Sequence, residues 1–215
     1  MKRLLLPILV LACFSVNAQT YVDSHDPNEI KSLLGKENDL AGFGGADLKF
    51  GQVLDTRSLI IGGYGGLLVN NTYMLGMAAY GLATDNEFTG FIPGSNEVKN
   101  LNLHMGYAGL LLGATILRKE IVHISMPVVF GAGSIDVSDH NFFDQNIVTD
   151  TDFTIENSVF FVVEPSLQLE FNITKNFRIA VGASYRWVQG SDLQNINDKE
   201  LSDFISSVSF RFGKF

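Results

Sequence analysis

The sequence contains a single cysteine, Cys13, and it lies within the first eighteen residues. Those residues are laid out like a secretory signal. Lys2 and Arg3 precede a short apolar run, and small or aliphatic residues lead to a cleavage point after Ala18. Cleavage there would leave no thiol, which excludes disulfides and a cysteine nucleophile. Acylation of Cys13, as in a lipoprotein, is the alternative interpretation of the same residues.

Basic residues are also scarce. The chain has 15 Lys and Arg against 23 Asp and Glu, and loss of the signal would lower its net charge from −8 to −10. A nucleic-acid-binding protein needs a basic patch, so this balance argues against nucleic acid as a partner. About 197 residues would remain after cleavage, which is enough for one domain with its own core.

Long apolar runs are absent after the signal. A membrane-spanning helix needs roughly 20 consecutive apolar residues, and the longest candidate, residues 106–117, is too short. The chain has alternation instead. From Phe177 to Trp187 the odd positions are apolar or aromatic, and the even positions are small or cationic. A period of two is typical of a strand with one apolar face.

Runs of this kind recur eight times. They lie near residues 40–50, 58–69, 73–84, 101–116, 122–135, 159–172, 177–188 and 204–213. Tight connections at 70–72, 118–120 and 174–176 alternate with long polar ones at 85–100, 138–158 and 189–203, and 51–57 is a shorter loop. An even number of strands with short turns at one end is typical of bacterial outer-membrane barrels. We therefore expect an all-β fold over residues 40–215: an eight-stranded antiparallel up-and-down transmembrane β-barrel.

Residues 19–39 would precede this barrel on the periplasmic side. Asp26, Pro27 and Glu29 form a helix-start signal, and Gly35 is suited to end the helix. We expect a short N-terminal periplasmic helix that covers one mouth of the barrel, or else binds a protein partner.

The last strand carries a resemblance to a known family. Val208, Phe210 and Phe212 alternate with polar residues, and the chain ends on Phe215. Residues 40–215 resemble the small eight-stranded outer-membrane barrels of the OmpX, OmpW and OmpA-barrel type. The resemblance implies a place in the cell outer membrane and contact with its lipid and lipopolysaccharide. It also implies that Phe210, Phe212 and Phe215 form the signal for the barrel-assembly machinery.

The lipid-facing strands of such a barrel carry aromatic residues at both membrane interfaces. Phe177 and Trp187 are ten residues apart. At a tilt near 45° this spacing covers roughly 23 Å along the membrane normal, close to an apolar band of about 25 Å. The expected girdle consists of Tyr73, Phe171, Phe177, Tyr185, Trp187 and Phe204.

The opposite face of the strands would line the lumen. Charges of both signs on neighbouring strands predict a salt-bridged network that fills a narrow barrel. Its expected members are Asp47, Lys49, Glu164, Gln168, Glu170, Arg178, Arg186 and Arg211, with His104 and His123 on the same inward face. A narrow channel for small solutes or ions is the alternative. We expect no metal site and no cofactor, because carboxylate or cysteine spacing to support the histidines is missing.

His123 and Ser125 raise the question of an enzyme. They resemble the His-x-Ser pair of the outer-membrane lipid A deacylases, which are also eight-stranded barrels. The alternation, however, points His123 inward, and no Glu follows at the matching distance. We therefore expect no enzyme but a structural or surface-binding protein in envelope integrity, adhesion or a larger assembly. A soluble periplasmic barrel of the lipocalin type, with its apolar face turned inward, is a further alternative.

The loop over residues 138–158 is acidic and contains no Lys or Arg. Phe142, Phe143 and Phe153 lie among its carboxylates. We expect this loop to be exposed. It is a candidate site for a protein partner, or for divalent cations shared with lipopolysaccharide phosphates.

Overall fold

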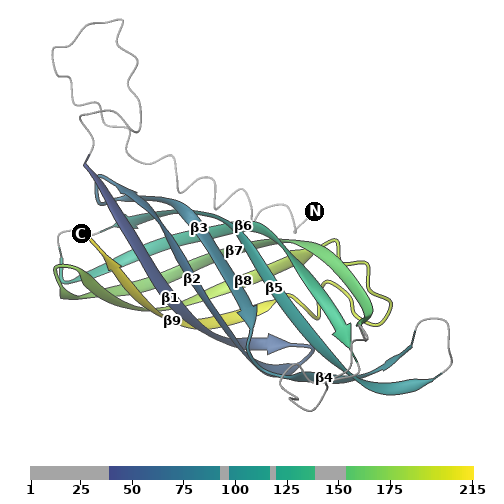
Figure 1. The fold of residues 1–215 in the computed structure, drawn as a ribbon. Helices are drawn as coiled ribbons and strands as arrows, with labels where there is room; N and C mark the ends of the chain where they lie inside the picture. Colours follow the sequence, from purple (N-terminus) through teal and green to yellow (C-terminus); the bar gives the residue numbers. More distant parts are fainter. Residues whose placement is uncertain (1–38, 93–96, 117–119, 139–153) are drawn as a thin grey trace, which may run out of the picture. The chain divides into compact units, whose positions relative to one another are not determined.

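Strands account for most of the chain in this computed structural model, which describes residues 39–92, 97–116, 120–138 and 154–215. The expected signal peptide and N-terminal helix lie outside these residues. The strands are β1 (Leu40–Val53), β2 (Thr56–Val69), β3 (Tyr73–Leu82), β4 (Asn86–Phe91), β5 (Val98–Ile116), β6 (Val122–Ser138), β7 (Thr154–Thr174), β8 (Phe177–Gln189) and β9 (Asp203–Gly213) (Figure 1). No helix in the described part of the chain is long and apolar enough to cross a membrane.

Eight of these strands close into a ring. The order β3-β2-β1-β9-β8-β7-β6-β5 is completed by antiparallel pairing between β3 and β5. β4 follows β3 after a three-residue interruption and pairs with the first part of β5, so it prolongs the same position of the wall. The prediction of an eight-stranded antiparallel up-and-down barrel is confirmed.

Two of the expected connections are wrong. Residues 51–57 do not form a loop, because β1 and β2 continue until only Leu54 and Asp55 separate them, with φ of 56° and 57°. Positive φ at both central residues is the geometry of a two-residue hairpin turn. Residues 85–100 contain β4 and the start of β5. This hairpin extends beyond the ring, where Leu101 of β5 is fully buried and Phe88 of β4 packs against the hydrophobic core.

The two faces of the barrel wall differ in chemistry. Large apolar side chains point outward, and Met77, Leu110, Val159, Phe161 and Leu167 each expose more than half of their surface. Charged side chains point inward and are buried. This is the polarity of a barrel that spans a membrane, and it is the reverse of a soluble barrel of the lipocalin type.

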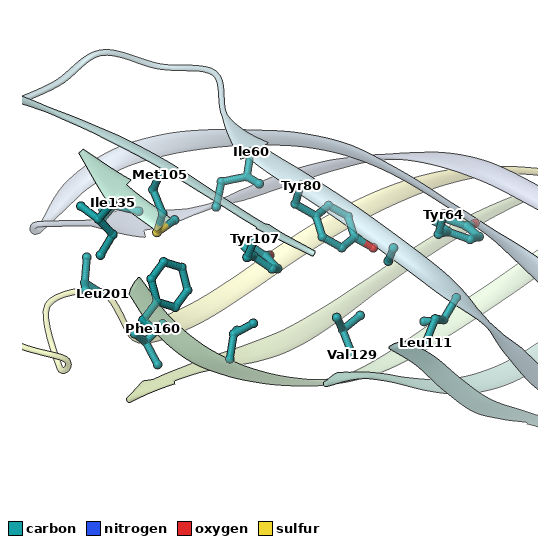
Figure 2. Close-up of a cluster of buried hydrophobic side chains, with 14 of the residues drawn as sticks. Ile60, Tyr64, Tyr80, Met105, Tyr107, Leu111, Val129, Ile135, Phe160 and Leu201 are labelled. Carbon is teal, nitrogen blue, oxygen red and sulfur yellow. The ribbon is translucent and has the colours of Figure 1, made fainter. Parts of the chain in front are cut away.

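Glycines make room for aromatic rings inside the barrel. Gly62 is the cross-strand partner of Tyr80, and a Cβ atom on Gly62 would collide with that ring. Gly45 has the same relation to Tyr64, whose hydroxyl would lie 2.6 Å from an added Cβ. Figure 2 shows Tyr64, Tyr80 and Tyr107 in the interior. The glycine-rich strands therefore allow a narrow lumen to be filled by rings.

One end of the lumen is apolar. We call the end that holds the turn between β2 and β3 the short-turn end, and the opposite end the long-loop end. Leu201 precedes β9 at the long-loop end and lies near Ile135, Met105 and Phe160 (Figure 2). Each of these four side chains is at most 5% exposed. This apolar cap separates the middle of the lumen from solvent on the long-loop side.

Candidate functional site

The first polar cluster of the lumen surrounds Glu164 on β7. The Lys49 Nζ donates to Glu164 Oε1 at 2.7 Å. The Tyr107 hydroxyl donates to Oε2 at 2.5 Å, and the Ser184 hydroxyl donates to Oε1 at 2.8 Å. Glu164 exposes none of its surface and Lys49 only 4%. The carboxylate is therefore held by three donors away from solvent, as a buried charge requires.

Tyr80 connects this pair to a second carboxylate. Its hydroxyl donates to Asp47 Oδ2 at 2.8 Å, and the Lys49 Nζ lies 3.2 Å from the centroid of its ring. The ring of Tyr107 lies beside it, with 5.2 Å between centroids. Aromatic faces attract a cation electrostatically. Lys49 is thus surrounded by carboxylates and rings, and these replace the water it would otherwise need.

The second polar cluster surrounds Glu170, nearer the short-turn end. Arg211 Nη1 pairs with Glu170 Oε1, and Arg178 Nη1 lies 3.3 Å from Oε2. Arg211 also donates through Nε to the Tyr64 hydroxyl at 3.0 Å and through Nη2 to Gln168 Oε1 at 3.4 Å. One carboxylate therefore links guanidinium groups from β8 and β9.

Arg186 lies beside Tyr107 of the first cluster and also bonds to the backbone. Its Nε donates to the Leu201 carbonyl at 2.8 Å, and its Nη2 donates to the Gln52 carbonyl at 3.1 Å. The guanidinium, which is 1% exposed, therefore ties the segment before β9 to the end of β1. The residues expected to form one network are thus arranged as two clusters, and Arg186 connects the first cluster to the segment before β9.

Little free space remains between the two clusters. The cavity that Asp47, Tyr64 and Arg211 help to line has a volume of about 10 Å³, close to the least that holds one water molecule. At the short-turn end, the guanidinium carbon of Arg178 lies 3.8 Å from the centroid of the Phe215 ring. The described side chains therefore leave little space between the two clusters and also pack together at the short-turn end.

The residues of the expected aromatic girdle lie on the outer wall. Tyr73, Phe171, Tyr185, Trp187 and Phe204 are exposed, from 37% for Phe171 to 74% for Phe204, and Phe177 is half-buried. Phe177 stacks on Phe212 of β9, with 4.7 Å between the ring centroids. Of the three residues of the expected assembly signal, Phe212 is 58% exposed and Phe210 half-buried on the same face, while Phe215 packs against the buried core.

His123 and Ser125 belong to the lumen wall. Both are fully buried. The Ser125 hydroxyl donates to Gln168 Oε1 at 3.3 Å, so its hydrogen bond runs across to β7. A nucleophile for lipid A would have to face the bilayer, and this pair faces the opposite way.

His104 does not share the inward face with His123, and the prediction that it does is wrong. The inward positions of β5 belong to odd-numbered residues such as Leu103 and Met105, which are 0% and 5% exposed. The two histidines also lie near opposite ends of β5 and β6, because His104 pairs with Asp136 while His123 follows the turn. Within the described ranges no three His, Cys, Asp or Glu side chains gather in a way that could hold a metal ion.

Sequence reasoning missed the three lumen tyrosines. Tyr64, Tyr80 and Tyr107 supply the hydroxyls that contact Arg211, Asp47 and Glu164. A glycine that lies opposite a tyrosine on the neighbouring strand would have indicated an inward ring. Such a pair can be recognised only when the register between the two strands is known. The apolar cap was missed as well, because Leu201 lies in a segment with a polar sequence.

Solved structures of other proteins share this fold. The crystal structure of Neisserial surface protein A matches with a TM-score of 0.54 at 10% sequence identity, over 83% of this chain and 99% of that one. The chain has the fold of the small eight-stranded outer-membrane β-barrels. The N-terminal barrel domain of Pseudomonas aeruginosa OprF (TM-score 0.45, 10% identity, 80% of this chain and 96% of that one) also matches. Ail of Yersinia pestis matches as well, with a TM-score of 0.44 at 13% identity, over 81% of this chain and 97% of that one. No family model and no curated protein sequence matches this barrel.

Proposed function

We propose that this protein is a small barrel of the bacterial outer membrane with a structural or surface-binding role, in envelope integrity, adhesion or a larger assembly. The observation that carries the proposal is the filled lumen. Glu164 and Glu170 are fully buried, and each holds its cationic partners without intervening water. Such a barrel acts through its outer wall and its exposed ends.

The packing of the lumen argues against the alternative of a narrow channel. An ion that crosses the barrel would have to break the pair between Lys49 and Glu164 and pass the apolar cap. Separation of a buried pair costs several kcal/mol, and the apolar side chains of the cap do not replace the water that an ion loses. Conduction would need a lumen that holds a continuous file of water molecules. The cavity between the two clusters, with a volume of about 10 Å³, has room for about one.

The expected partners follow from the outer wall. The exposed apolar side chains support contact with outer-membrane lipid and lipopolysaccharide. Phe210 and Phe212 lie on this wall and support recognition of the last strand by the barrel-assembly machinery. Phe215 would be recognised by that machinery before folding is complete, because it packs against the buried core in the folded barrel. Residues 139–153 of the acidic loop and the N-terminal helix, the two proposed sites for a protein partner, lie outside the described residues.

No catalytic role is included in the proposal. The burial of His123 and Ser125 within the wall supports a packing role, because a lipid substrate approaches from the outer face. A shift in the mass of lipid A on expression of the protein, abolished by His123→Ala, would contradict this part of the proposal.

Fractionation tests the membrane part of the proposal. The full chain is expressed with its signal, outer membranes are separated, and gel migration is compared with and without boiling. We expect a membrane-bound band whose migration changes on boiling. A soluble periplasmic protein without such a change would overturn the outer-membrane assignment.

Planar bilayers test the closed lumen. We expect no conductance steps from the wild type, nor from Lys175→Ala, a variant of an exposed turn residue. The double variant Arg178→Ala/Phe215→Ala removes two side chains that pack together at the short-turn end. It should stay closed too, because the apolar cap remains. Regular steps from the wild type would favour the channel.

A further inference from the structure

Two hollows lie on the outer wall near the long-loop end, on either side of residues 198–204. The first has a volume of about 580 Å³, and its lining includes Phe50 and Arg57 together with Phe204. The second has a volume of about 310 Å³, and its lining includes Trp187 and Lys199. Each hollow thus combines exposed aromatic surface with one cation.

The aromatic surfaces of the two hollows are continuous. Tyr185, which lines the second hollow, is the cross-strand partner of Phe204, which lines the first. Their ring centroids are 4.9 Å apart. Phe50, Trp187 and Phe204 expose 51%, 52% and 74% of their surfaces. An apolar strip therefore runs across β1, β9 and β8 on the outer wall near the long-loop end.

The two cations have no side-chain partner among the residues that the structure describes. Arg57 and Lys199 are exposed, and within the described ranges neither side chain makes an ion pair or a hydrogen bond. The carboxylates in the hollows are engaged elsewhere. Asp203 accepts the Gln52 backbone N–H at 2.7 Å, and Asp198 accepts two backbone N–H groups and a hydroxyl. Each hollow therefore offers an available positive charge to a ligand.

We infer that the two hollows form one site for a doubly phosphorylated lipid of the outer leaflet. Its acyl chains would lie on the aromatic strip, and its phosphates would bind Arg57 and Lys199. Aromatic residues of a membrane barrel mark the level of the lipid headgroups, and cations beside them meet phosphate at that depth. The inference rests on the proposed outer-membrane location and contact with lipopolysaccharide, and it adds a defined site with the residues that bind the phosphates.

Charge complementarity favours a lipid phosphate as the occupant. The chain is acidic overall, with a net charge of −8, so it does not attract anions broadly. An anion would bind only where unpaired cations are presented. Arg57 offers the forked guanidinium that suits a phosphate, and both cations lie beside apolar surface that suits acyl chains. A free phosphate would make no use of that apolar surface.

Trp187 provides a direct measurement, because it is the only tryptophan of the chain and lines the second hollow. The full folded protein is placed in phosphatidylcholine vesicles, and Trp187 emission is followed while bisphosphorylated lipid A is added. We expect a saturable change. Each cation near anionic lipid contributes roughly a fivefold gain in affinity, so Arg57→Gln/Lys199→Gln should weaken binding about 25-fold.

Lys99→Gln is the matched control. Lys99 is an exposed cation of the β5 hairpin, but it lines neither hollow and has an interaction within the protein. Its removal should leave the titration unchanged. An equal titration for the wild type and the Arg57→Gln/Lys199→Gln variant would overturn the site. An equal response to dephosphorylated lipid A, or to phosphatidylglycerol at the same charge density, would overturn the choice of ligand.

The heat-dependent gel shift separates this result from the proposed function. All variants should keep the shift, because the substituted side chains are exposed. If the wild type keeps the shift but gives no saturable response to lipid A, the lipid site is refuted and the outer-membrane barrel stands. If the wild type neither inserts into vesicles nor shows the shift, the proposed function fails first.

Discussion

The change Glu164→Gln keeps the shape of the side chain and removes its charge. Its partner, the Lys49 ammonium, lies 2.7 Å away and is almost fully buried. Removal of one member of a buried ion pair leaves the other charge without compensation, and such losses are about 3–5 kcal/mol. We expect a loss of this size in the free energy of unfolding of Glu164→Gln.

Coulomb's law brackets this magnitude. Two unit charges 2.7 Å apart attract each other by about 1.5 kcal/mol in water and by about 6 kcal/mol at an effective dielectric constant of about 20. The burial of both groups places the pair nearer the second value. The loss stays below it because the variant no longer has to bury a carboxylate, and because the ring of Tyr80 still contacts Lys49.

Guanidinium titration of the folded protein in vesicles, followed by Trp187 emission, measures the loss. Glu87→Gln on β4 is the matched control, since its exposed carboxylate should contribute no more than about 0.5 kcal/mol. The double change Lys49→Met/Glu164→Leu should recover much of the loss, because it removes both charges. A loss of about 1 kcal/mol or less for Glu164→Gln would refute the reasoning. It would mean that water reaches Lys49 and that the lumen is not closed.

Three further predictions concern the wall and the loops. Gly62→Ala should lower stability by about 1–3 kcal/mol, since its Cβ collides with Tyr80, whereas Gly42→Ala, which meets open space, should be nearly neutral in the same titration. Asn71→Val should cost about 1–2 kcal/mol because φ at Asn71 is 51°, whereas Asn71→Gly should be tolerated. Burial alone would raise the pKa of Asp198, but the hydrogen bonds that it accepts from Ser191 and Gly190 hold its pKa below that of an ordinary aspartate. The stabilisation that Asp198 gives to this loop should therefore be complete at neutral pH and be lost only as the pH falls through the lowered pKa. Hydrogen exchange of the Gly190 and Ser191 amides measures it, and the pH dependence should be absent in Asp198→Asn.

The sequence predicts the fold because the wall of a membrane barrel has only two faces. Strict alternation between Phe177 and Trp187 determines which side chains face lipid, and the pattern of connections determines the number of strands. The same alternation assigns Glu164 and Lys49 to the lumen. It does not pair them, because β1 and β7 are separated by β9 and β8 in the ring. That contact depends on barrel closure and shear, which no local pattern encodes.

The parts that the sequence does not predict lie where the constraint of the bilayer ends. β4 pairs with β5 beyond the ring, and there Leu101, Asn102 and Leu103 are buried in succession, so strict alternation is lost. The apolar cap has the same cause. Leu201 enters the lumen from a polar segment, and its burial depends on Ile135 and Phe160, which come from other strands. The expected inward position of His104 is wrong because β5 carries Leu at both inward and outward positions, so its sequence does not show which face is which.

The apolar cap and the ion pairs depend on each other. The pair of Lys49 and Glu164 is strong only while water is excluded, and the cap excludes it on the long-loop side. The cap in turn is held by charge, because Arg186 binds the Leu201 carbonyl and the end of β1 from within the lumen. Weakening of either part therefore admits water to both. The segment before β9 is thus part of the lumen's closure, although its sequence resembles that of an ordinary surface loop.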